Sequence, residues 1–73
     1  MGIAVRYTND GDGTSVSVQE SRRAEDGHTQ RRRVTKDFGN SAKGADDGLI
    51  FVHGVNHGEI RPDDILPPWS DES

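Results

Sequence analysis

The scarcity of large apolar side chains limits most strongly how this chain can fold. Val, Ile, Leu and Phe together occupy fourteen of the 73 positions, just under the share of about 20% at which disorder competes with folding. A chain of this length forms one domain at most, and such a domain buries only about 60% of its unfolded surface. Cysteine is absent, so neither disulfides nor a thiolate metal site can support a small core.

Strict alternation of apolar and polar residues predicts strands in the first half of the chain. Residues 3–8 and 14–20 each place their apolar side chains on one face. The segment NDGDG between them, residues 9–13, is typical of a hairpin turn because Gly accepts positive φ and Asn and Asp tolerate it. A second turn at 24–28 and a third strand at 31–38 are expected to follow.

The second half predicts less regular structure. Residues 39–48 hold no apolar side chain larger than alanine, so we expect an exposed loop, with a short helix as the alternative. The continuous run LIFVHGV, residues 49–55, predicts a central strand buried on both faces. A short final strand is expected at 59–61, before Pro62 ends regular pairing.

These elements predict an all-β fold without an amphipathic helix of useful length. Residues 1–61 are expected to form a small antiparallel sheet or partly open barrel of four to five short strands. Residues 62–73 are expected to form an extended C-terminal tail, acidic and hydrophobic in composition.

Basic and acidic residues are segregated along the chain. Residues 21–36 carry six basic groups and two acids, whereas residues 59–73 carry five acids and one Arg. The simplest interpretation is that the two regions attract each other. The alternative is that the basic residues bind nucleic acid from a small β-barrel, because Arg side chains suit phosphates. The basic residues concerned are Arg22, Arg23, Arg31, Arg32, Arg33 and Lys36.

Two observations oppose nucleic-acid binding by this basic cluster. Tyr7 and Phe38 are the aromatic side chains nearest to it, which is too few for stacking on single strands. The sequence pI of about 5.1 also opposes strong binding, because such affinity comes mainly from neutralised phosphates.

The C-terminal segment combines apolar anchors with acids. Its adjacent prolines favour an extended chain, Trp is a frequent interface hot spot, and the acids would steer the segment toward a basic groove. We expect the segment either to dock on a protein partner or to pack on its own sheet. The predicted partner-binding residues are Asp63, Asp64, Ile65, Leu66, Pro67, Pro68 and Trp69.

The motif DDILPPW, residues 63–69, resembles the acidic-hydrophobic tip that ends bacterial single-stranded-DNA-binding proteins. The resemblance implies the same mode of docking. In those tips the final aromatic carries the terminal carboxylate, whereas four further residues follow Trp69 here.

No arrangement of residues predicts chemistry. The serines lie in strand or loop contexts without a G-x-S-x-G elbow. His28, His53 and His57 are candidate metal ligands. The last two would share one face of a helix, but Gly54 and Gly58 argue against a helix there. We therefore predict no enzymatic activity, no metal site and no cofactor.

The sequence thus predicts a non-enzymatic protein-binding module or small inhibitor. It would contact a macromolecular partner through a sheet edge or through its C-terminal segment, as a phage or plasmid protein acting on a host protein would. A homodimer is a further alternative because free sheet edges pair readily with a second copy. No signal peptide or membrane span is visible, so a cytoplasmic protein without membrane contact is expected.

Overall fold

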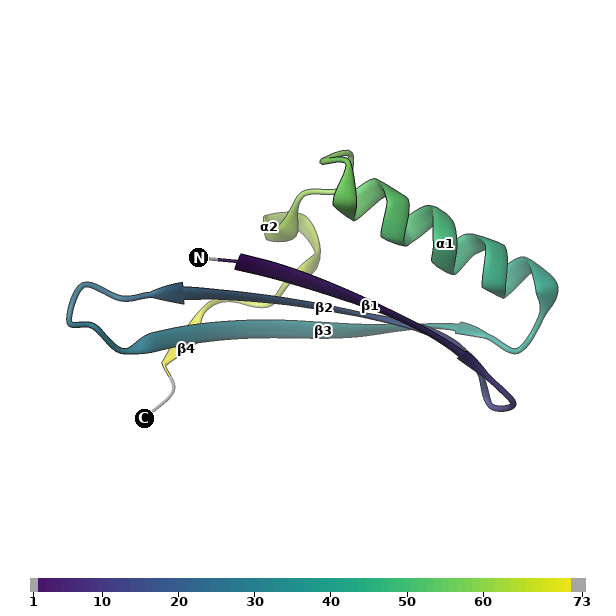
Figure 1. Cartoon of the computed structure of the whole chain (residues 1–73), viewed down its shortest axis with the longest axis horizontal. Helices are drawn as coiled ribbons and strands as arrows, with labels where there is room; N and C mark the ends of the chain where they lie inside the picture. The colour runs from purple at the N-terminus through teal and green to yellow at the C-terminus, as the bar shows by residue number, and fades with distance from the viewer. Residues whose placement is uncertain (1, 72–73) are drawn as a thin grey trace.

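Three long strands and one long helix make up most of the computed structural model, which describes residues 2–71. The sheet has the order β1-β2-β3-β4 and is antiparallel throughout. Helix α1 lies across one face of the sheet, and the other face carries no helix (Figure 1). The elements are β1 (Gly2–Asp10), β2 (Gly13–Arg23), β3 (Thr29–Gly39), α1 (Ala42–Asn56), α2 (Pro62–Ile65) and β4 (Ser70–Asp71).

The two hairpins follow the alternating sequence pattern, and the three predicted strands and two turns are confirmed. β1 pairs with β2 along its whole length, and β2 pairs with β3 with one register shift between Thr14 and Ser15. In the first turn, an Asp10 carboxylate oxygen accepts a hydrogen bond from the Asp12 N–H at 2.9 Å. Gly13 ends this turn with a φ of 129°, which favours glycine.

Helix α1 takes up residues 42–48 of the predicted loop and all of the central strand predicted for residues 49–55, so both of these predictions are wrong. The alternative of a helix within residues 39–48 agrees with the structure, although the helix is longer than expected. The helix begins after Ser41, whose hydroxyl oxygen accepts a hydrogen bond from the Gly44 N–H at 3.0 Å. This N-cap satisfies one of the backbone donors that a helix leaves unpaired at its start.

The buried face of α1 explains why the helix is hard to see in the sequence. Gly44, Gly48, Phe51 and Val55 are buried and are spaced by four, three and four residues, which is the helical period. Two of these four positions are glycine and leave no mark in a pattern of apolar residues. The exposed apolar neighbours at positions 49 and 50 lengthen the apolar run and imitate a buried strand.

The glycines let the helix backbone rest directly on the sheet. A Cβ atom added at Gly44 would lie 2.2 Å from the carbonyl oxygen of Phe38, and one added at Gly48 would lie 2.8 Å from the methyl carbon of Thr14. Both separations are too short for real contacts, so something must shift at either position. At Gly44 the obstacle is backbone, and a larger residue there requires the helix and the sheet to move apart.

A small core lies between α1 and the central strand β2. Val16 and Val18 are fully buried, and Phe51, Val55 and Leu66 are nearly so. The burial of each such side chain contributes about 1.5–3 kcal/mol. Partly buried side chains pack around this core: Val5, Tyr7, Val34, Phe38, Val52, Ile60 and Ile65.

The chain after α1 returns to the sheet without the strand predicted at residues 59–61. The Ile60 N–H donates to the Gly54 carbonyl oxygen at 3.0 Å, and the Ile60 side chain covers Gly54. Pro62 starts α2, a position where its missing N–H has no cost. β4 then pairs with the start of β3 over two residues.

The protein is therefore mostly sheet: a three-strand antiparallel open sheet plus one long helix. The prediction of an all-β fold is wrong for the second half of the chain. The prediction of four to five strands is not confirmed, since β4 contributes only two residues beside the three long strands.

Replacing Gly44 with alanine should lower the free energy of unfolding by about 1–3 kcal/mol. Alanine favours a helix by about 1 kcal/mol, but its Cβ would meet a backbone oxygen that cannot rotate away. Urea unfolding followed by circular dichroism measures the change. Gly11→Ala is the matched control, because its Cβ would enter open space. Equal stability of Gly44→Ala and the wild type would contradict this account of the interface.

Candidate functional site

The face of the sheet opposite α1, called the open face below, is polar along its whole length. Since strand residues alternate between faces, the pairing register places cross-strand rows of side chains on it. In order along the sheet, the rows are Arg23 and Thr29; Ser21 and Arg31; Ala4, Gln19 and Arg33; Arg6, Ser17 and Thr35; Thr8, Ser15 and Asp37; and Asp10 beside Gly13. The largest wholly apolar side chain in these rows is Ala4.

The predicted basic cluster is divided between the two faces of the sheet. Arg23, Arg31 and Arg33 occupy open-face positions, whereas Arg22, Arg32 and Lys36 occupy positions on the side of α1. This division follows from the alternation of side chains along each strand. The basic residues therefore do not form one patch, and only Arg23, Arg31 and Arg33 lie on the open face.

Arg6 joins the open face, although the sequence reading did not include it. It is an isolated basic residue in β1, but the register places it in the row next to that of Arg33. A shallow hollow of about 410 Å³ lies between them, lined by Ala4, Val5, Arg6, Ser17, Gln19 and Arg33. The alternation of β1 together with the hairpin register was the signal that would have found Arg6.

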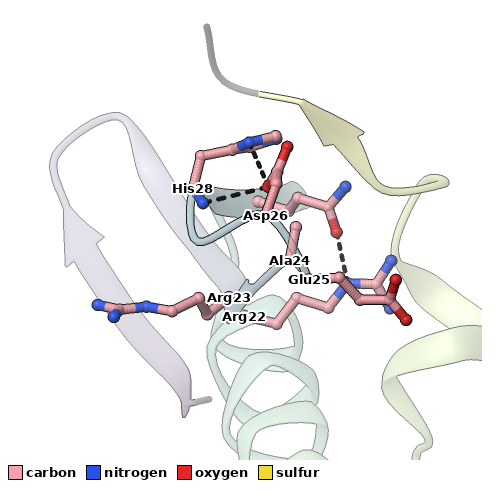
Figure 2. Close-up of a pocket in the computed structure, with 7 residues that line it drawn as sticks. Arg22, Arg23, Ala24, Glu25, Asp26 and His28 are labelled. Carbon is pink, nitrogen blue, oxygen red and sulfur yellow. Dashed lines mark hydrogen bonds and ion pairs between the residues drawn. The ribbon is translucent and has the colours of Figure 1, made fainter.

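A second hollow, of about 620 Å³, lies at the turn between β2 and β3 (Figure 2). Arg22 and Arg23 point in opposite directions there. The Arg22 Nε donates to the Gln30 side-chain oxygen at 2.7 Å. His28 Nδ1 lies 2.6 Å from an Asp26 carboxylate oxygen. The polar groups of this hollow are largely engaged with one another, which is typical of a turn that holds its own shape.

The C-terminal segment packs on the side of the sheet that carries α1. Leu66 joins the core, and Ile65 packs against it. The guanidinium carbons of Arg22 and Arg32 lie 4.1 Å and 4.4 Å from the centre of the Trp69 ring. Such cation–π contacts hold the ring in place. Of the predicted partner-binding residues, Asp63, Asp64, Pro67 and Pro68 are left exposed.

Arg32 links the C-terminal segment to the sheet. Its Nη2 donates to Glu20 at 2.6 Å and to Asp63 at 2.7 Å, and its Nε donates to Glu20 at 2.9 Å. The hydrogen bond to Asp63 is the largest cause of the raised Arg32 pKa. The same hydrogen bond and the nearby positive charge lower the pKa of Asp63. The predicted attraction between the basic and acidic regions therefore has a concrete form in this ion pair.

Replacing Asp63 with asparagine should make the free energy of unfolding depend less on pH in the acidic range. Because the pKa of Asp63 in the folded chain lies below its ordinary value of 3.8, its ionised form stabilises the fold above that pH. This stabilisation is lost as the pH falls through the lowered pKa. The effect should be modest because the Asp63 side chain is 79% exposed and solvent screens the pair.

Urea unfolding from neutral to acidic pH measures the effect. Asp63→Asn should be less stable than the wild type at neutral pH and equal to it in strong acid. Asp64→Asn, at an exposed neighbouring carboxylate, is the control and should follow the wild type. A stability difference between Asp63→Asn and the wild type that stays constant across pH would contradict the role given to the ion pair.

The described part of the chain, residues 2–71, holds neither a large cluster of metal ligands nor a membrane-spanning helix. That part of the chain contains no group of three or more His, Cys, Asp or Glu side chains placed to hold one metal ion. Nor does it contain a helix long and apolar enough to cross a membrane.

The candidate site is thus the open face with its four arginines, Arg6, Arg23, Arg31 and Arg33. Comparison with known proteins finds no family model, curated protein or solved structure that matches this chain.

Proposed function

We propose that the protein binds double-stranded nucleic acid with the open face of its sheet. The observation that carries this proposal is a broad polar face holding four arginines, with hydroxyl and amide side chains between them. Arginine forks bind phosphates and the acceptor edge of guanine with two hydrogen bonds. Serine, threonine and glutamine side chains also form hydrogen bonds to phosphates and base edges.

The charge on this face supports the proposal despite the net charge of −4 for the whole chain. Within residues 2–71, no ion pair engages Arg6, Arg23 or Arg33. The acids at open-face positions, Asp10 and Asp37, lie toward the opposite end of the sheet from Arg31. A polyanion that approaches Arg6, Arg23 and Arg33 therefore meets guanidinium groups that no ion pair engages within residues 2–71.

The absence of aromatic side chains from the open face favours a duplex over a single strand. Proteins that bind single strands stack the bases on aromatic rings. Tyr7 and Phe38 instead pack against the core, and Trp69 is held by Arg22 and Arg32 on that side. The open face therefore offers hydrogen bonds and charge without a stacking surface.

The width of the sheet also suits a duplex. Neighbouring strands lie about 4.8 Å apart, so the axes of β1 and β3 are separated by about 10 Å. The major groove of B-form DNA is about 12 Å wide and admits a two-stranded ribbon, so two neighbouring strands of the open face, β1 and β2 or β2 and β3, would enter it. Because α1 and α2 lie on the other side (Figure 1), neither helix blocks an approach of the open face to a groove.

Replacing both Arg6 and Arg33 with alanine should weaken duplex binding by at least tenfold. Each bidentate contact to a base is worth about 1–3 kcal/mol, or roughly 5- to 150-fold in affinity. Fluorescence anisotropy with a labelled mixed-sequence DNA duplex measures the change. The wild-type affinity should fall steeply as salt is raised, and the salt dependence should be weaker in the double variant.

Lys43→Ala/Arg61→Ala is the matched control for this experiment. It removes the same charge from exposed positions on α1 and before α2, away from the open face, and should bind the duplex nearly as the wild type does. An equal loss of duplex affinity in both double variants would show that net charge alone explains the binding, and would contradict the proposal. Tighter binding to a matched single strand than to the duplex would contradict it as well.

A specific observation keeps protein binding as the second candidate function. β1 is an outer strand of nine residues without proline, and Ile3 on it is 47% exposed. Long uncovered edges of this kind pair with a strand from another protein. The packing of Leu66 and Trp69 on the domain itself makes this edge, rather than the C-terminal segment, the better supported route to a protein partner.

Ile3→Lys distinguishes the second candidate from the first, because lysine on an edge strand opposes strand addition. If β1 recruits a partner, this variant should keep the wild-type circular dichroism spectrum and lose the partner in a pull-down with quantitative mass spectrometry. It should retain duplex binding. Capture of the same partners at wild-type levels by Ile3→Lys would exclude the edge.

A further inference from the structure

The C-terminal end of α1 places two histidines side by side. His53 lies in the last turn of the helix, and His57 follows as its C-cap, so that the two are four residues apart. Their ring centroids are 4.0 Å apart, with a tilt of 32° between the rings. The sequence argued against this arrangement because of Gly54, but Gly54 is a helical residue packed under Ile60.

We propose that His53 and His57 form a chelating site for a divalent transition-metal ion. Imidazole nitrogen is a preferred ligand of Cu²⁺, Ni²⁺ and Zn²⁺. Metal–nitrogen bonds are about 2.0–2.1 Å long, so two nitrogens bound to one ion lie roughly 3 Å apart. Both residues are exposed, and modest rotations about their side-chain bonds bring a nitrogen of each ring to that separation.

The surroundings of the pair favour a cation. The last carbonyl groups of a helix carry partial negative charge, which stabilises positive charge nearby. Neither histidine is engaged in an ion pair within residues 2–71. His28 differs in this respect, because its Nδ1 lies against Asp26.

The chemistry of the site follows from its two ligands. A chain that supplies two nitrogens leaves the other coordination positions to water, so the ion exchanges readily. Because affinity rises along the series to Cu²⁺ and falls again at Zn²⁺, Cu²⁺ should bind most tightly. The site lies on α1, across the sheet from the open face (Figure 1), and does not depend on the proposed nucleic-acid binding.

Titration calorimetry with Cu²⁺ at neutral pH tests the site in the full-length protein. The wild type should bind one ion per chain at the pair, and His53→Ala and His57→Ala should each weaken this binding at least tenfold, because each leaves a single ligand. His28→Ala is the matched control and should bind as the wild type does. Unchanged Cu²⁺ affinity in both His53→Ala and His57→Ala, or its loss in His28→Ala, would overturn the proposal.

Nuclear magnetic resonance on the wild-type protein provides a test that needs no variant. Substoichiometric Cu²⁺ is paramagnetic and broadens the signals of residues close to it. The amide signals of residues 53–58 should broaden first, before those of the turn at residues 24–28. Broadening that begins at the turn or at the chain start would place the ion elsewhere and overturn the proposal.

Discussion

The fold depends on the close contact between the glycine-lined face of α1 and the central strand. With fourteen large aliphatic or Phe side chains in the chain, a thick core cannot form, and buried area must come from short distances. Gly44 and Gly48 provide these distances, since they allow the helix backbone to reach Phe38 and Thr14 directly. Val16 and Val18 are then completely excluded from solvent, so that two small side chains contribute all of their apolar area to the core.

The ion pair and ring contacts of Arg32 extend this small core at one end. Arg32 is nearly buried, and a buried guanidinium is costly unless its donors are satisfied. Glu20 and Asp63 accept its hydrogen bonds, and Trp69 covers its face. The acidic, apolar end of the chain thus completes the domain, and its anchors are largely occupied there.

The alternation of side chains along β2 and β3 divides the basic stretch between the two faces of the sheet. Neighbouring arginines lie in different surroundings, because each step along a strand changes the face. Arg22 and Arg32 hold the C-terminal segment, while Arg23, Arg31 and Arg33 lie with Arg6 on the open face. A linear count of charges does not reveal this division, whereas the register does.

The sequence by itself determined the two hairpins and their turns. Alternation at residues 3–8 and 14–20 is a local signal, and the glycines and acids between them specify a turn without help from the rest of the chain. The segregated charges also indicated an attraction between the basic and acidic regions, with docking of the C-terminal segment on a partner as the alternative. The Arg32–Asp63 ion pair is one such attraction.

Only the tertiary structure decided the state of residues 42–56 and the position of Arg6. A run such as LIFV fits a buried strand as well as a helix, and the two glycines that mark the buried helical face have no side chain to display a period. The need for glycine at these positions is visible only in the folded structure, because Phe38 and Thr14 of the sheet leave no space for a Cβ atom. Likewise, the open face exists only after three strands have paired, because its rows combine residues that are far apart in the sequence.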